Sequence, residues 1–287
     1  MGCGENIRQA ECELKYKTRV GKEFVFLQFA WDSWEYGSPD APRAGQFFMI
    51  KPRRTGVFLG RPISCAYLNQ DGAGFLVARR GAGTRDLCDM VLGEKADLIG
   101  PLGNAWTDFL PETRFEEEWK NVPFGEKPPG FKPILLVAGG IGIAPMTALL
   151  HENKFTGRPR DFAMIYGLRT EQDDLRWEEQ ILGIFRLHPR DMTWVTEDGS
   201  YGRKGRVTDF LEPEKYSEVC ACGPEPMLKA VAEKCAAAGV RCLVSLERRM
   251  ACGVGACLGC TVVTKTGNRR CCADGPIFDA SEVIFDG

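Results

Sequence analysis

Four cysteines near the C-terminus have a spacing that can bind a metal. Cys252, Cys257 and Cys260 lie close together, and Cys272 follows. The pattern C-x4-C-x2-C…C is typical of a plant-type [2Fe–2S] cluster, in which a short loop wraps the irons and a distant cysteine completes the ligand set. Glycines between these cysteines suit such a loop, because amides that approach cluster sulfurs need close contact and positive φ. A cluster passes single electrons, so the pattern predicts electron transfer.

Two alternatives concern the same cysteines. Four thiolates can also hold a structural zinc, but zinc ribbons usually carry two C-x2-C pairs, and this region carries one. Cys271 competes with Cys272 for the fourth position, and spacing alone does not separate them.

A glycine-rich turn is the second feature that could do chemistry. Ile134–Ala138 reads as a buried strand, Gly139-Gly140-Ile-Gly142 as a turn, and a helix is expected to start near Pro145. Free amides and the helix dipole at such a turn can bind a phosphate. A tight turn without a ligand is the alternative, since the string is not the G-x-G-x-x-G fingerprint.

Two shorter strings in the N-terminal half could bind a phosphate or a flavin. Arg61-Pro62-Ile63-Ser64 offers a forked cationic donor and a hydroxyl. Gly81-Ala-Gly83-Thr84 could present backbone amides and a hydroxyl to a pyrophosphate. Each string alone is weak, because either could be an ordinary turn at the end of a strand.

Composition narrows the possible functions. The chain of 287 residues suggests about two domains, and its net charge of -2 gives no general attraction to nucleic acid or to anionic membranes. Its longest apolar stretch, Ile134–Leu150, is broken by glycines and is too short to span a membrane. Only two histidines occur, His151 and His188, each expected at a surface or a helix end, so a Ser-His-Asp hydrolase is not expected. Thirteen cysteines without a secretory signal favour the reducing cytoplasm.

The elements that must position these motifs fall into three units. Short segments with turn signals between them predict a small antiparallel β-barrel or sandwich over residues 1–110. The expected strands are Phe24–Phe29, Gln46–Lys51, Cys65–Leu68, Phe75–Ala78 and Ala96–Ile99. A linker is expected at 111–132, and a second exposed loop at 32–43.

From residue 133 the pattern changes to strands that alternate with helices. Such alternation predicts an α/β doubly wound domain over 133–244. The expected strands are Ile134–Ala138, Phe162–Tyr166, Thr193–Thr196 and Val219–Cys222, and the expected helices are Ala144–Asn153, Leu175–Phe185, Val207–Leu211 and Pro226–Ala237. Residues 245–287 form a third unit, which is too small to fold without its cofactor.

Taken in order, the motifs resemble the ferredoxin–NADP reductase superfamily. Besides those above they include Gly100-Pro-Leu-Gly-Asn104, Thr196-Glu-Asp-Gly-Ser-Tyr-Gly202 and Cys222-Gly-Pro-Glu-Pro-Met227. The cysteine loop, followed by Cys272-Ala-Asp-Gly-Pro-Ile-Phe278, makes the chain look like the electron transfer subunits of type 1B dihydroorotate dehydrogenases, the PyrK family. The resemblance covers nearly the whole chain and favours Cys272 as the fourth ligand.

The resemblance implies three groups of cofactor-binding residues and no catalytic side chain, since the cofactors carry the chemistry. The first group contacts FAD and comprises Arg61, Pro62, Ile63, Ser64, Leu76, Val77, Ala78, Gly83 and Thr84. The second lines the pyridine-nucleotide cleft and comprises Gly139, Gly140, Gly142, Cys222, Gly223 and Pro224. The third binds the [2Fe–2S] cluster and comprises Cys252, Cys257, Cys260 and Cys272. The family often has a tyrosine where Val77 stands.

The resemblance also implies a function and a partner. Electrons would pass from an FMN-containing dihydroorotate dehydrogenase subunit through the cluster and FAD to NAD⁺, in de novo pyrimidine synthesis. The implied complex is a heterotetramer with two copies of each subunit. A reductase subunit of another complex, similar to those of sulfide dehydrogenase or sulfite reductase, is the nearer alternative, and a zinc-stapled nucleotide sensor without turnover is the more distant one. Arg169, Arg203 and Lys204 leave the choice between NADH and NADPH open.

Overall fold

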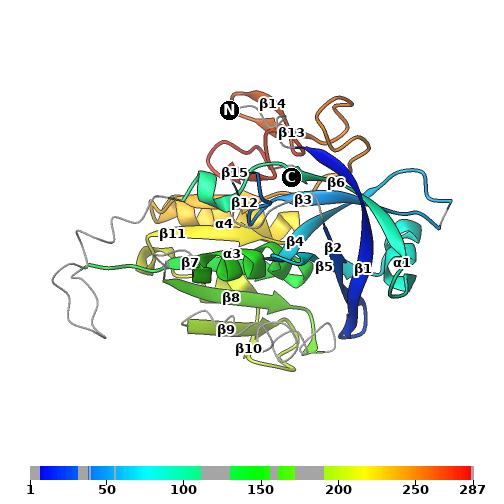
Figure 1. Ribbon diagram of the computed structural model, residues 1–287. Coiled ribbons are helices and arrows are strands. Elements are labelled where there is room, and N and C mark those ends of the chain that lie inside the picture. The colour runs from blue at the N-terminus through cyan, green and yellow to red at the C-terminus, as the bar shows by residue number, and fades with distance from the viewer. Residues whose placement is uncertain are drawn as a thin grey trace.

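The computed structural model describes residues 7–31, 38, 40–54, 56–110, 130–155, 161–171 and 191–285. Figure 1 shows a barrel, a sheet flanked by helices, and a small hairpin above both. The predicted fold class is therefore confirmed. Most of the 111–132 segment, the expected helix Leu175–Phe185 and His188 lie outside the described residues.

The first unit is a closed antiparallel barrel with strand order β1-β2-β5-β4-β3-β6. Its strands are β1 (Arg8–Val20), β2 (Phe24–Ala30), β3 (Phe47–Pro52), β4 (Arg61–Asn69), β5 (Gly72–Ala78) and β6 (Lys95–Leu102), and α1 (Ala82–Asp89) follows β5. The five strands expected from the sequence are all present. β1 and α1 were not expected.

Aromatic side chains fill the barrel. Phe29, Phe48 and Phe75 are fully buried, and the rings of Phe48 and Phe75 meet edge to face with their centroids 5.7 Å apart. Edge-to-face contact is a favoured geometry for two aromatic rings. These aromatic side chains form the core of the barrel.

The second unit is a seven-stranded sheet with the order β10-β9-β8-β7-β11-β12-β15. All neighbouring strands run parallel except β12 and β15. The strands are β7 (Ile134–Gly139), β8 (Phe162–Leu168), β9 (Asp191–Thr196), β10 (Arg203–Lys204), β11 (Glu218–Cys222), β12 (Cys242–Ser245) and β15 (Ile277–Asp279). β7 and β11 lie at the centre and are buried along their whole length, as parallel strands covered on both faces usually are.

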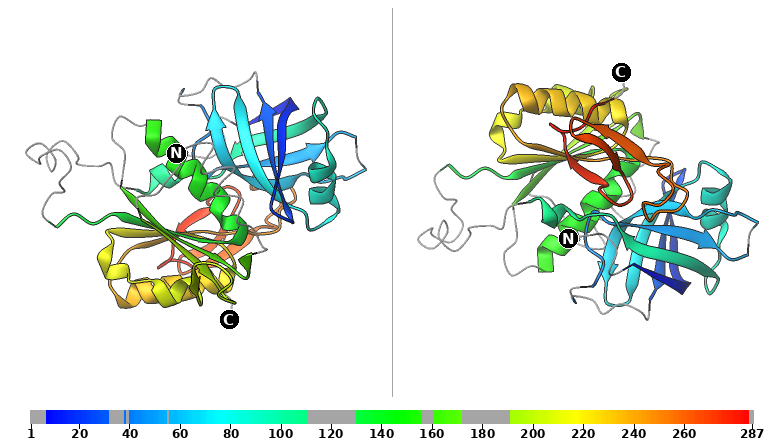
Figure 2. Two further views of the ribbon diagram at one scale, coloured as in Figure 1. Left: turned by 90° about the horizontal axis from the view of Figure 1, so that it is seen from below. Right: turned by 90° about the horizontal axis from the view of Figure 1, so that it is seen from above.

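Helices cover both faces of this sheet. Figure 2 shows α3 (Ile143–Phe155) on the face toward the barrel and α4 (Glu225–Ala237) on the opposite face. Both agree with the sequence. The helix expected at Val207–Leu211 is instead a 3-10 turn over Val207–Phe210, and further 3-10 turns occupy Trp106–Asp108, Gly140–Gly142 and Pro213–Lys215.

The barrel and the sheet are joined through α3 and β4. The buried Thr147 hydroxyl on α3 donates to the carbonyl oxygen of Ala66 on β4 at 2.8 Å. His151 is also buried, and its ring lies 4.2 Å from that of Tyr67. The expectation of a surface or helix-end His151 was therefore wrong, because this face of α3 packs on the barrel instead of on solvent.

The third unit carries the cysteine loop and a hairpin of β13 (Thr261–Thr264) and β14 (Gly267–Arg270). The chain then returns to the sheet, where β15 pairs antiparallel with β12. The C-terminal unit is therefore tied to the nucleotide-domain sheet by strand pairing. None of the described helices combines the length and the apolar character that a membrane span requires.

Candidate functional site

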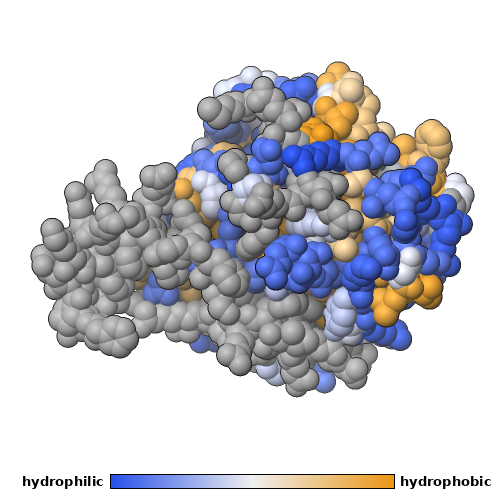
Figure 3. Space-filling view, viewed as in Figure 1, coloured by the Kyte–Doolittle hydropathy of each residue, from blue (hydrophilic) through white to orange (hydrophobic). Residues whose placement is uncertain are grey.

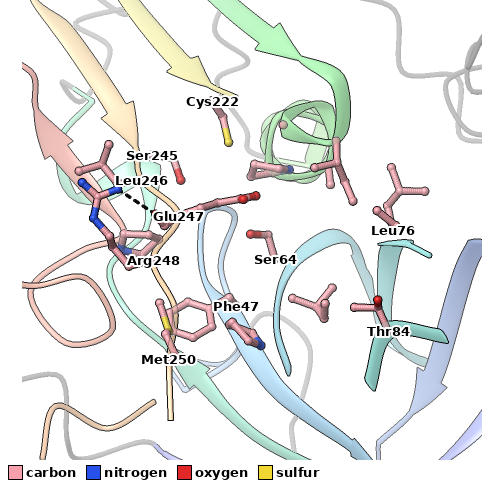
Figure 4. A pocket seen from close by; sticks show the side chains of 18 of the residues that line it. Phe47, Ser64, Leu76, Thr84, Cys222, Ser245, Leu246, Glu247, Arg248 and Met250 are labelled. Carbon is pink, nitrogen blue, oxygen red and sulfur yellow. Dashed lines mark hydrogen bonds between the residues drawn. The ribbon is translucent and has the colours of Figure 1, made fainter. Parts of the chain in front are cut away.

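A cleft lies where the barrel, the sheet and the C-terminal unit meet. It has about 950 Å³ of empty volume and is open to solvent. Residues from all three units line it: Phe47, Pro62, Ile63, Ser64, Leu76, Ala78, Arg80, Thr84, Ile141, Gly142, Ala144, Pro145, Cys222, Ser245, Leu246, Glu247, Arg248, Met250 and Pro276. Figure 4 shows the labelled side chains converging on this space from both domains.

On the barrel side, the cleft brings two of the sequence motifs together. Pro62, Ile63 and Ser64 at the start of β4 line the cleft. Arg61 packs over Gly83, where a Cβ atom would lie 2.3 Å from Arg61 Nε. The absence of a side chain at position 83 therefore allows the guanidinium to lie flat on the start of α1.

Strand β5 divides its predicted contacts between two faces. Leu76 and Ala78 line the cleft, whereas Val77 belongs to the barrel core. Successive side chains of a strand point to opposite faces, so three consecutive residues cannot all face one ligand. The side chain of Val77 accordingly does not reach the cleft.

Thr84 orders the turn that starts α1. Its Oγ accepts hydrogen bonds from the amides of Arg80 at 3.1 Å and Gly81 at 3.0 Å. The same hydroxyl donates to the Gly81 carbonyl oxygen at 3.1 Å. The hydroxyl is thus engaged with the backbone, while the side chain still borders the cleft. The helix begins at Ala82, so this motif forms the start of α1.

On the sheet side, the glycine turn after β7 packs closely against the end of β11. A Cβ atom at Gly142 would lie 2.2 Å from the Cys222 carbonyl oxygen. Gly139 and Gly223 approach each other in the same way, and Pro224 lies beside them. The Gly140 carbonyl oxygen accepts a hydrogen bond from the hydroxyl of Tyr166. Of the predicted nucleotide residues, Gly142 and Cys222 line the cleft itself, and the others form the turn behind it.

Sequence reasoning missed the polar group at the centre of the cleft. The Glu247 carboxylate reaches into the space toward Ser64 (Figure 4). Its side chain is exposed to the cleft but flanked by protein atoms. The resulting loss of hydration raises the pKa of the carboxyl, although the positive charge of Arg80 acts to lower it. Arg80 directly precedes the identified string Gly81–Thr84, which is the signal that could have found it. Glu247 lies two residues after β12, a strand that the sequence analysis did not predict.

Cys222 and Ser245 form the sheet wall beside Glu247. Burial raises the pKa of the Cys222 thiol, although a hydrogen bond from Ser245 acts to lower it. The thiol is therefore neutral at physiological pH. Arg248 borders the cleft but makes a two-pronged ion pair with Glu225, at 2.9 and 3.1 Å.

The C-terminal cysteines lie in a loop whose amides point at sulfur atoms. Cys260 Sγ and Cys272 Sγ are 3.2 Å apart, and the amide of Gly255 donates to Cys272 Sγ at 3.1 Å. Cys271 Sγ donates instead to the Leu246 carbonyl oxygen at 3.1 Å. Amides directed at thiolates are the interactions that stabilise the charge of an iron–sulfur centre.

The other two cysteines form a second pair in the same loop. Burial would raise the pKa of Cys252, but hydrogen bonds from the amides of Cys257, Val254 and Ala256 and from the Cys257 thiol lower it to about 7. Cys257 itself is exposed. Within the described part of the chain, no three His, Cys, Asp or Glu side chains converge closely enough to hold a single metal ion. The loop does, however, supply the thiols and donors that a cluster needs.

The cysteine loop stands directly on the barrel. A Cβ atom at Gly253 would lie 2.6 Å from Met49 Cγ and 3.1 Å from Leu102 Cδ1. Met250, two residues before Cys252, lines the cleft. The chain therefore passes from the lining of the cleft into the cysteine loop within two residues.

Two family models match the chain in the regions just described. Residues 247–284 match the iron–sulfur cluster binding domain of dihydroorotate dehydrogenase B, and residues 136–233 match the oxidoreductase NAD-binding domain. The first match contains all four predicted ligands. The second covers the glycine turn after β7 and the end of β11.

Curated relatives match over most of their length. The dihydroorotate dehydrogenase B (NAD(+)) electron transfer subunit of Clostridium perfringens is 38% identical over 84% of this chain and 87% of its own. That of Caldanaerobacter subterraneus subsp. tengcongensis is 34% identical over 93% of this chain and 95% of its own.

Solved structures share the fold. A chain of an NADH-dependent reduced ferredoxin-NADP oxidoreductase, described in a study of flavin-based electron bifurcation, superposes with a TM-score of 0.74 at 26% identity, covering 96% of this chain and 91% of its own. The ferredoxin reductase of carbazole 1,9a-dioxygenase superposes with a TM-score of 0.60 at 21% identity, over 83% of this chain and 68% of its own. With relatives of this identity along most of its length, the chain belongs to the family of dihydroorotate dehydrogenase B electron transfer subunits.

Proposed function

We propose that this protein carries electrons from a dihydroorotate-oxidising subunit that contains FMN, through a [2Fe–2S] cluster and FAD, to NAD⁺. The observation that carries the proposal is the meeting of three units at one cleft, with the cysteine loop beginning two residues after Met250, which lines the cleft. FAD, when bound, exchanges a hydride with the nicotinamide and single electrons with the cluster. The physiological setting that we infer is pyrimidine synthesis in the cytoplasm.

The residues on the two walls of the cleft divide the binding between them. We assign the barrel wall, with Arg61, Ser64 and the start of α1, to FAD. The start of α3 is assigned to the nucleotide, because Gly142, Ala144 and Pro145 place a helix N-terminus at the cleft, where the dipole favours a phosphate. Leu76 and Ala78 provide an apolar surface for a planar ring.

For the cluster we assign Cys252, Cys257, Cys260 and Cys272 as ligands. The contact between Cys260 and Cys272, and the amide that Gly255 directs at Cys272, support this set. The hydrogen bond from the Cys271 thiol to the Leu246 carbonyl oxygen supports leaving Cys271 out of the set.

The partner would bind over the cysteine loop. Exposed apolar side chains gather there, namely Val254, Leu258 and Val263, and Figure 3 shows this orange surface at the upper right. Contiguous apolar surface on a folded protein commonly marks an interaction site. Docking at this surface would bring a second redox centre close to the exposed Cys257. We infer a complex with two copies of each subunit.

Purification of the native complex tests this function. The protein, isolated through an affinity tag under anaerobic conditions, should bring with it an FMN protein that reduces NAD⁺ when dihydroorotate is added. Recovery of subunits of sulfur metabolism, with no dihydroorotate oxidation, would contradict the proposal. It would favour the alternative of a reductase subunit in another complex.

A further inference from the structure

We propose that Asn104 is a positioning residue that sets the spacing between the flavin cleft and the cluster cysteines. The inference rests on the FAD and cluster of the proposed function and is independent of the partner's identity. Asn104 follows β6 of the barrel, outside the lining of the cleft. Its role comes from the segment that it holds.

Asn104 joins the barrel to the C-terminal unit by four hydrogen bonds. Its amide side chain donates to the carbonyl oxygens of Asp274 at 3.2 Å and Ile277 at 2.9 Å, and its Oδ1 accepts from the amide of Ile277 at 3.0 Å. Its backbone amide donates to the Gly275 carbonyl oxygen at 2.7 Å. One residue thus pairs with most of the polar backbone atoms of a four-residue segment.

The barrel holds Asn104 in place. Gln46, which is buried, donates from Nε2 to the Gly103 carbonyl oxygen at 2.8 Å. Gly103 has a φ of +77°, and a Cβ atom there would lie 2.6 Å from both the Gly275 carbonyl oxygen and Pro276 Cδ. Glycine is therefore required for the two backbones to approach, and Asn104 fixes them once they have met.

The segment that Asn104 holds touches both redox sites. Pro276 lines the cleft, and its carbonyl oxygen accepts from the Leu246 amide at 2.9 Å. Asp274 lies two residues after Cys272, and its carboxylate accepts from Arg270 N at 2.7 Å and from its guanidinium at 3.0 Å. A shift of this segment would move Cys272 relative to the cleft wall.

Such a shift would act more strongly on electron transfer to the cluster than on hydride transfer. The rate of electron tunnelling falls exponentially with the distance between redox centres, whereas hydride transfer takes place on the sheet side of the cleft. Asn104→Asp preserves size and Oδ1 but removes both side-chain donors and sets a carboxylate against two carbonyl oxygens. We expect electron transfer from the flavin to the cluster to slow severalfold.

The test separates the two steps in the full chain loaded with FAD and cluster. After anaerobic mixing with NADH, flavin bleaching reports hydride transfer, and cluster absorbance reports the electron passed on. Asn104→Asp should leave the first rate within about twofold of wild type and slow the second, while amide hydrogen exchange at 274–278 accelerates, as expected for lost hydrogen bonds. Asn69→Asp, at the opposite end of β4 from the cleft, is the matched control.

Three outcomes would overturn the inference. They are unchanged cluster reduction, an equal loss in both steps, or slowed cluster reduction with normal exchange at 274–278. Asn104→Ala, which removes the bonds without adding charge, decides the matter by the same criteria if Asn104→Asp fails to fold. A wild-type protein without any cluster signal would contradict the proposed function, and this result is distinct from those three.

Discussion

At the scale of single residues, Gly83 is a position where one added methyl group should weaken FAD binding. In Gly83→Ala the new methyl group would lie 2.3 Å from Arg61 Nε and 2.6 Å from its Cζ, so the guanidinium must move. We expect FAD affinity to fall at least about tenfold, a loss of about 1.4 kcal/mol. Titration of the FAD-free protein with FAD, followed by flavin fluorescence, measures this change.

The control lies two residues earlier. A Cβ atom at Gly81 would meet nothing within 4 Å. Gly81→Ala should therefore bind FAD as wild type does. Equal losses in the two variants would show that the packing of Arg61 on Gly83 is irrelevant to FAD.

Glu247 links the cleft to pH. Desolvation raises the pKa of its carboxyl from the ordinary value of 4.5, although Arg80 opposes the shift. Between the two pKa values the folded protein binds more protons than the unfolded chain, so this carboxyl lowers stability as pH rises through that window. Below the ordinary value both states are protonated, and the penalty is absent.

Glu247→Gln should consequently raise the melting temperature above that window and leave it unchanged at more acidic pH. Calorimetry of both proteins across the acid range measures the difference. Glu214→Gln removes an exposed carboxylate and controls for net charge. A gain that persists at the acid end of the range would contradict the assignment.

At the scale of elements, the turn between β7 and α3 holds the sheet side of the cleft together. Gly142→Ala would place a methyl group 2.2 Å from the Cys222 carbonyl oxygen, a backbone atom that cannot rotate away. Overpacking of this kind costs about 1–3 kcal/mol. Urea unfolding should show a loss of that size, together with a weaker response to NADH.

Gly56→Ala is the control variant for Gly142→Ala. A Cβ atom at Gly56 would contact nothing within 4 Å. Its unfolding free energy should stay within about 0.5 kcal/mol of wild type. A loss as large as that of Gly142→Ala would mean that the contact with Cys222 does not matter.

The sequence predicted a strand well when that strand is buried on both faces, and less well when it is exposed on one face. The central strands β7 and β11 are apolar throughout and were identified with bounds close to those observed. β1 was missed because charged residues alternate along it from position 11 to 19. A search for short apolar runs overlooks such a strand, although its period of two is a strand signal.

Site residues that belong to a local sequence motif were predictable. Residues that reach the cleft only through tertiary contacts were missed. Ser64, Gly142 and Cys222 sit in recognisable strings and do line the cleft. Phe47 and Pro276 reach it only because β3 and the C-terminal segment fold back onto the same place. Val77 is predicted from resemblance as a FAD contact on the strand along the flavin, and its side chain lies in the barrel core.

At the scale of the whole molecule, the apolar surface over the cysteine loop predicts which substitution should weaken binding between the subunits. Val263→Asp would place a charge on this surface, at a side chain that is 44% exposed. We expect affinity for the dihydroorotate-oxidising subunit to fall at least about tenfold. Size-exclusion chromatography of the mixed subunits measures this, and NADH oxidation with an artificial acceptor should stay unchanged.

Leu92→Asp, at a barrel side chain that is 62% exposed, is the matched variant. It should assemble as wild type does. Normal assembly of Val263→Asp would move the docking surface elsewhere on the molecule.

The pairing of β15 with β12 has a consequence for biogenesis. β15 follows the cysteine loop in the chain, so the ribosome releases the loop before the strand that completes the sheet. Until then β12 is an open edge, the kind of surface through which nascent proteins aggregate. Protection of that edge therefore depends on the last strand of the sheet, which is synthesised only after the cysteine loop.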